Sequence, residues 1–177
     1  MALYVAGFEI KTTNTPEYWK NSSPVVLSED SSGNGSATSI FVSGIDVYVA
    51  GYIFNGTYSI AAYWKNGSPV ILSKNSNDAQ AYSILVSGND VYVAGYEFNG
   101  MQHIAKYWKN GSPVNLTDGS SDAYAECILV SGNDVYIAGA EYSAQRLVYI
   151  AKYWKNGSPV NLSDGSHDAG ATSIFLK

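Results

Sequence analysis

The stretch Val91-Tyr92-Val93-Ala94-Gly95 decides the fold, because it recurs at a constant interval along the chain. Closely similar stretches occupy residues 3–7, 47–51 and 135–139, and their glycines are spaced 44 residues apart. Self-similarity at a fixed interval of this size is typical of repeat architectures. The chain therefore contains four copies of a repeat of about 44 residues.

Each repeat predicts four short strands separated by turns. In one copy the apolar run 124–130 ends at a Ser-Gly-Asn-Asp turn, and the β-branched and aromatic run 135–140 follows. A polar loop leads to the run 150–155, which ends at Asn156-Gly157, a strong hairpin signal because both residues tolerate positive φ. Residues 159–162 give a fourth strand whose initial proline fits an exposed edge.

This pattern predicts an all-β fold, a β-propeller of four four-stranded antiparallel blades. We expect one propeller domain over residues 1–177, with repeats at approximately 3–46, 47–90, 91–134 and 135–177. Runs such as 83–86 are apolar at consecutive positions, as expected of an inner strand buried on both faces. A β-sandwich is the alternative fold, but it does not account for so regular a repeat.

The phase of the repeat predicts how the propeller closes. Residues 3–7 match the second strand of a repeat, whereas residues 171–176 match the first strand. We therefore expect the last strand to complete the first blade by pairing with residues 3–7. Two rings satisfy this pattern, a closed four-bladed monomer and an eight-bladed ring of two chains. We favour the closed monomer, because intramolecular closure does not depend on concentration.

The motifs Tyr-Trp-Lys-Asn-Gly-Ser-Pro-Val and Ser-Gly-Asn-Asp-Val-Tyr-Val-Ala-Gly resemble those of highly repetitive bacterial β-propeller proteins. The resemblance covers essentially the whole chain, and the first blade departs most, with Asn21-Ser22-Ser23 in place of Asn-Gly-Ser. It implies a propeller fold and a bias towards secreted or surface-attached proteins, and it brings no catalytic residues. The N-terminus shows no signal-peptide pattern.

Composition argues against several classes of partner. The net charge is −5 and Arg146 is the single arginine, so the basic stripe of a nucleic-acid binder is missing. No apolar run approaches the length of a membrane span, so membrane insertion is not expected. Cys127 is the single cysteine and aligns with serines in the other repeats, which predicts a small filler on an apolar strand.

Comparing the four copies predicts which end of the propeller binds. The turns after the first and third strands barely change between copies, whereas the loops after the second and fourth strands vary. We call these two ends the turn face and the loop face. Because binding usually resides on variable loops carried by a rigid scaffold, the loop face is the candidate site. The candidate ligand-binding residues are Tyr58, Tyr82, His103, Tyr124, Glu126 and Tyr149.

Other residues are better explained by structure than by chemistry. Large aromatics dominate core burial, so we expect Trp19, Trp64, Trp108 and Trp154 to pack between blades. The segments 118–122 and 164–168 lack the ligand series of a calcium loop, and we interpret them as turns. No metal or other cofactor is expected.

The sequence therefore favours a non-catalytic binding propeller, with a glycan or a protein surface as its ligand. The four nearly equal blades do not supply the convergent asymmetric set of groups that an enzyme needs. The alternatives are a purely structural repeat module and, less favoured, a propeller hydrolase or lyase. A lectin is expected to show repeated pockets between blades, and an enzyme a single acidic central pocket.

Overall fold

The computed structural model describes residues 1–27, 34–74 and 77–177. All its regular elements are β-strands, and none of the described residues forms a helix that could cross a membrane. The strands are β1 (Tyr4–Ile10), β2 (Asn14–Lys20), β3 (Ser23–Val26), β4 (Asn34–Ser43), β5 (Asp46–Phe54), β6 (Ser59–Lys65), β7 (Ser68–Ile71), β8 (Ala79–Ser87), β9 (Asp90–Phe98), β10 (His103–Lys109), β11 (Ser112–Asn115), β12 (Ala123–Ser131), β13 (Asp134–Ser143), β14 (Val148–Lys155) and β15 (Ser158–Asn161).

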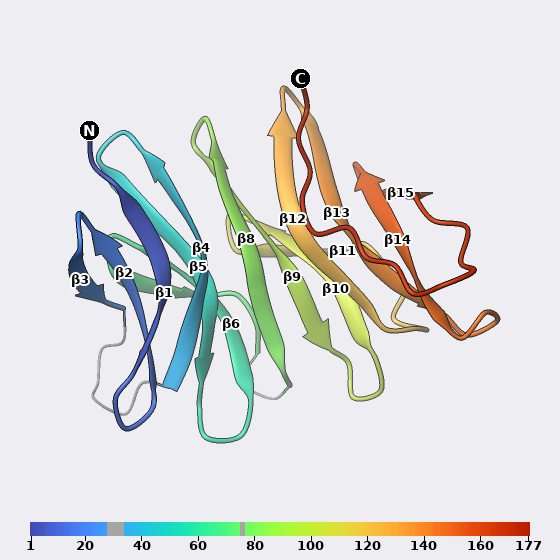
Figure 1. Cartoon of the computed structure of the whole chain (residues 1–177), viewed down its shortest axis with the longest axis horizontal. Helices are drawn as coiled ribbons and strands as arrows, with labels where there is room; N and C mark the ends of the chain where they lie inside the picture. The colour runs from blue at the N-terminus through green and yellow to red at the C-terminus, as the bar shows by residue number, and fades with distance from the viewer. Residues whose placement is uncertain (28–33, 75–76) are drawn as a thin grey trace.

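The strands form four antiparallel meander sheets that correspond to four propeller blades. Blade 1 contains β1–β2–β3, blade 2 β4–β5–β6–β7, blade 3 β8–β9–β10–β11 and blade 4 β12–β13–β14–β15. The blades stand side by side in chain order, each packed on the next, with blade 1 and blade 4 at opposite ends of the row (Figure 1). The all-β, four-bladed propeller architecture is thus confirmed.

The predicted closure of the first blade is wrong for the single chain. Blade 1 is three-stranded, and the segment 171–176 does not pair with β1. The backbone N–H groups of Ala169 and Ala171 instead donate to the carbonyl oxygens of Tyr149 (3.0 Å) and Gly139 (3.2 Å) in blade 4. The row of blades stays open, so the four-bladed closed ring that we favoured does not form in this structure.

Small residues line the contacts between consecutive blades. Ala50, Ala61, Ala94 and Ala105 are fully buried where one blade faces the next. Alanine lets two sheets approach closely along their whole width.

Tryptophans fill the space between consecutive blades, as predicted. Trp64, Trp108 and Trp154 are fully buried, and each contributes to the core that its blade shares with the preceding blade. Trp19 is only partly buried, because among the described residues no other blade packs on its side of blade 1.

The turn face is held together by one repeated polar arrangement. In blade 2, Asn66 of the β6–β7 turn accepts from the Val47 N–H (2.9 Å) and donates to Asp46 (2.8 Å) at the start of β5. Asp46 also pairs with Lys65 (3.0 Å). Equivalent contacts join Asp90 with Lys109 and Asn110, and Asp134 with Lys155 and Asn156. These contacts explain why the turn sequences barely vary.

The innermost strand of blades 2, 3 and 4 carries a β-bulge. The pairing register shifts between Ala37 and Ser39 in β4, between Ala81 and Ser83 in β8, and between Ala125 and Cys127 in β12. Thr38, Tyr82 and Glu126 are the extra residues, which have no partner in the strand ladder. A bulge re-aims side chains near its position.

Candidate functional site

Five tyrosines form a continuous line of rings across blades 3 and 4 on the loop face, and we call this line the aromatic row. Its members are Tyr82, Tyr96, Tyr124, Tyr149 and Tyr142. Successive ring centroids are 5.7, 5.3, 6.2 and 5.3 Å apart, within the range of direct aromatic contact. The row joins inner strands of both blades to the loop-facing ends of β9, β13 and β14.

The topology explains why distant tyrosines meet. Tyr82 is the bulge residue of β8, and Tyr96 lies on the neighbouring strand β9. Tyr124 belongs to β12, the inner strand of the next blade, which packs against β9 and β10. Neighbouring blades therefore place residues about one repeat apart side by side.

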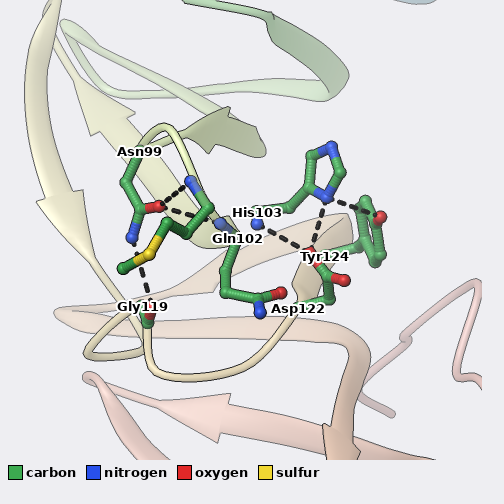
Figure 2. A network of polar contacts seen from close by, with 7 residues as sticks. Asn99, Gln102, His103, Gly119, Asp122 and Tyr124 are labelled. Atoms are coloured by element: carbon green, nitrogen blue, oxygen red, sulfur yellow. Dashed lines mark hydrogen bonds and ion pairs between the residues drawn. The ribbon is translucent and has the colours of Figure 1, made fainter.

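His103, at the start of β10, is enclosed by aromatic rings and a carboxylate. Its ring centroid lies 4.9 Å from that of Tyr96, 5.1 Å from that of Tyr124 and 5.1 Å from that of Phe98. His103 Nδ1 lies 2.7 Å from Asp122 Oδ1 and 3.0 Å from the Tyr124 hydroxyl, as Figure 2 shows. These contacts orient both His103 and Tyr124.

Asp122 makes a backbone contact that recurs in other blades and a contact with the His103 ring that does not. Its Oδ1 accepts from the His103 backbone N–H at 2.8 Å, as Asp78 accepts from Ser59 (2.8 Å) and Asp168 from Tyr149 (2.7 Å). Each of these aspartates joins the loop before an inner strand to the third strand of the preceding blade. A histidine stands at this third-strand position in blade 3 alone, so its ring contact with the aspartate is specific to that blade.

The neighbouring loop is fixed by its own hydrogen bonds. Asn99 Oδ1 accepts from the backbone N–H groups of Met101 (2.9 Å) and Gln102 (2.8 Å), and Asn99 Nδ2 donates to the Gly119 carbonyl oxygen (3.2 Å), as seen in Figure 2. Gly119 has φ +78°, and a Cβ there would lie 2.7 Å from Asn99 Nδ2. The side chains of the site therefore stand on an ordered support.

An open cleft of about 460 Å³ adjoins the aromatic row. It is lined by two tyrosines of the row together with residues of blade 4 and of the C-terminal segment, namely Tyr124, Ala140, Tyr149, Asp168, Ala169 and Gly170. The cleft combines aromatic rings, small apolar groups and one carboxylate, a composition common in sites for small polar ligands.

Burial controls the protonation of the site. Desolvation raises the pKa of the Tyr82 phenol, and the neighbouring Tyr96 and the Glu126 carboxylate raise it further. Desolvation also raises the pKa of the Tyr124 phenol, with a smaller contribution from Tyr149. Both hydroxyl groups therefore stay protonated at neutral pH and can donate hydrogen bonds. Burial likewise raises the pKa of Glu126.

The structure brings most of the predicted site residues together. Tyr82, Tyr124 and Tyr149 lie in the aromatic row, His103 packs against it, and the half-buried Glu126 lies close enough to Tyr82 to affect its ionisation. Tyr58 lies apart in the β5–β6 loop of blade 2, where Asn55 Oδ1 accepts from its backbone N–H at 2.8 Å. Among the described residues, Tyr58 makes no ring contact with the row.

The sequence did not identify three residues of the site. Tyr96 was not among the predicted residues, and its equivalents Tyr52 and Phe8 are also aromatic. Asp122 and Asp168 were assigned to turns, and their contacts across blades are visible in the structure alone. The signal for Tyr96 was its position five residues after Val91 on the variable end of the strand.

Two other sequence features have structural roles. Asp118 and Asp164 each accept from a backbone N–H two residues ahead, those of Ser120 and Ser166 (both 2.9 Å), which closes a turn. Lys106 pairs with Glu97 and Lys152 with Glu141, inside blades 3 and 4. These carboxylates are engaged in holding the blades.

The set of residues around this cleft is not repeated in the other blades that the structure describes. Tyr82 aligns with Thr38 and Glu126, and His103 aligns with Ser59 and Tyr149, so the chemistry of blade 3 is not copied in its neighbours. Residues 28–33 and 75–76 lie outside the described part of the chain. The arrangement is a single asymmetric site spanning two blades.

Comparison with known proteins supports the fold. No protein-family model and no curated protein matches the chain. Among solved structures, the β-propeller domain of the Trilobed protease from Pyrococcus furiosus, described as having an open velcro topology, matches with a TM-score of 0.52 at 15% sequence identity. The match covers 93% of this chain and 49% of that chain, so this chain spans about half the length of the propeller it matches. This likeness identifies the chain as β-propeller in fold.

Proposed function

We propose that this chain is a non-catalytic binding propeller that takes a glycan on the aromatic row and the adjoining cleft. The observation that carries the proposal is the cleft itself, which the partly buried rings of Tyr124 and Tyr149 line together with Asp168. Sugars offer apolar C–H faces and many hydroxyl groups. Tyrosine rings stack on the former, while phenol and carboxylate oxygens bond the latter.

The residues divide these tasks. Tyr124 and Tyr149 line the cleft with their rings, and the protonated hydroxyl of Tyr124 is available as a donor. Asp168 supplies an acceptor at the rim. His103 and Asp122 hold Tyr124 in place, so little side-chain freedom is lost when a ligand binds.

A glycan is favoured over a protein surface because of the shape of the site. The cleft of about 460 Å³ suits a short oligosaccharide, whereas a stable protein interface needs roughly 800 Å² from each partner. The resemblance to repetitive bacterial propellers fits a secreted or surface-attached glycan binder.

The test is a glycan array followed by calorimetric titration of the hits. Tyr124→Ala is expected to weaken binding at least tenfold, which corresponds to about 1.4 kcal/mol. Tyr58→Ala is the matched control, because Tyr58 is a tyrosine of an equivalent face that lies outside the row, and its affinity is expected to stay within about twofold. An array without specific binding would contradict a glycan ligand, and equal losses in both variants would contradict the assigned site.

A further inference from the structure

The outer face of blade 1 is apolar where the equivalent faces of other blades are buried. Leu3 and Val5 on β1 are 69% and 47% exposed. The equivalent residues of blade 2, Val47 and Val49, are 7% and 1% exposed, because they pack against blade 1. Trp19 shares the outer face of blade 1, and it is the one repeat tryptophan that is not fully buried.

Blade 4, at the other end of the row of blades, also exposes an apolar side chain that the other blades bury. Leu162 of blade 4 is 59% exposed, whereas the equivalent Leu27, Leu72 and Leu116 are at most 8% exposed because each packs against the following blade. The two end faces of the chain therefore carry the two halves of the contact that joins consecutive blades within it.

The C-terminal segment has the sequence of an inner strand and the position of one. Residues 171–175 read Ala-Thr-Ser-Ile-Phe, identical to residues 37–41 of β4. The segment runs along blade 4, as the inner strand of a blade runs along the blade before it (Figure 1). Among the described residues it pairs with no strand, and Phe175 is 83% exposed.

We propose that a second copy of this chain completes the structure, with residues 171–176 of each copy pairing with β1 of the other. The register follows from β4 and β5, in which Ser39 pairs with Ala50 and Phe41 with Tyr48. It places Ser173 opposite Ala6 and Phe175 opposite Tyr4 of the other copy. Leu162 then packs on the other copy's blade 1, against Leu3, Val5 and Trp19.

Two such contacts related by a two-fold axis give a closed ring of eight blades. A contact between unlike faces leads either to a ring or to an open filament, depending on the rotation between copies. A ring of two copies is the smallest ring in which every 171–176 segment pairs with β1 of another copy. This closure does not depend on the proposed glycan site.

The first test is the mass of the chain in solution by light scattering over a range of concentrations. We expect a discrete species of twice 19.0 kDa. Phe175→Asp is expected to shift it to the monomer, because the charge would lie inside the core beside Tyr4. Ile45→Asp is the control, since the Ile45 side chain is 96% exposed in the β4–β5 turn, and it should leave the dimer intact.

The second test establishes which copy supplies the strand. Ala6→Cys and Ser173→Cys are combined in a Cys127→Ser background, and the oxidised protein is run on a denaturing gel without reductant. A linked dimer is expected. A monomeric mass at every concentration, a ladder of higher species or a link within one chain would each overturn the proposal.

Discussion

The buried ion pair of blade 3 offers a stringent test of the packing between blades. Lys106 and Glu97 form an ion pair with side chains only 6% and 21% exposed. Blade 2 has Ala62 and Ile53 at the same two positions, so this chain already contains an apolar version of the pair. The ion pair of blade 3 can therefore be replaced by the two apolar residues that blade 2 already has at these positions.

Each single substitution leaves one charge without its partner. Glu97→Ile leaves the Lys106 ammonium buried and is expected to lower the free energy of unfolding by about 3 kcal/mol. Lys106→Ala leaves the carboxylate, which water reaches more easily, and about 2 kcal/mol is expected. The double variant recreates the apolar arrangement of blade 2 and should lie within about 1–2 kcal/mol of the parent.

Urea unfolding followed by tryptophan fluorescence, at one protein concentration, gives the four free energies. The expected coupling free energy between the two positions is about 3 kcal/mol. Lys65→Ala is the control, because this exposed lysine pairs with Asp46 and should cost no more than about 1 kcal/mol. Additive losses in the double variant would refute the view that the pair compensates for burial.

Three further predictions concern single positions. Gly95→Ala should unfold the chain or cost several times more than Gly132→Ala, as thermal unfolding can check. The Cβ of the former would lie 2.0 Å from a carbonyl oxygen of β8, whereas at Gly132 (φ +59°) only backbone strain opposes a side chain, since no atom lies within 4 Å. Burial raises the pKa of Glu126, so the charged carboxylate opposes folding at a pH above that pKa. Glu126→Gln should therefore raise the melting temperature at about pH 7. The gain should vanish on acidification, because the parent glutamate then becomes neutral like the glutamine. Hydrogen bonds from Lys109 and Asn110 lower the pKa of Asp90. The ionised Asp90 carboxylate therefore stabilises the fold above its unfolded-state pKa, and this contribution is lost as the pH falls through its folded-state pKa. Asp90→Asn should lower the melting temperature at about pH 7 and have little effect at about pH 2.

The blades were predictable because their signals are local and repeated. The Asn-Gly turns, the β-branched runs and the 44-residue interval each occur several times, so chance agreement is excluded by repetition. The closure of the ring was not predictable in the same way. Matching a strand to a blade says which residues pair, but it does not say whether the two strands belong to one chain.

The candidate site was predictable to the extent that it varies between copies. Tyr82, His103, Tyr124, Glu126 and Tyr149 were chosen because they differ from their counterparts or lie near variable loops, and the structure gathers them across blades 3 and 4. Tyr96 differs little from its counterparts Tyr52 and Phe8, so variation between copies does not mark it as a site residue. Tyr58 was included because loop position does not reveal which blade supplies the neighbouring rings.

The β-bulge of each inner strand has a consequence for how such a chain can diversify. Thr38, Tyr82 and Glu126 have no partner in the ladder, so the strand pairing places no demand on the chemistry of these side chains. When a blade is duplicated, this position is copied as one at which a polar, an aromatic or an acidic side chain leaves the strand pairing unchanged. A different residue can thus be substituted at the bulge of each blade. A protein of near-identical repeats can in this way acquire a surface on one pair of blades that the other blades lack.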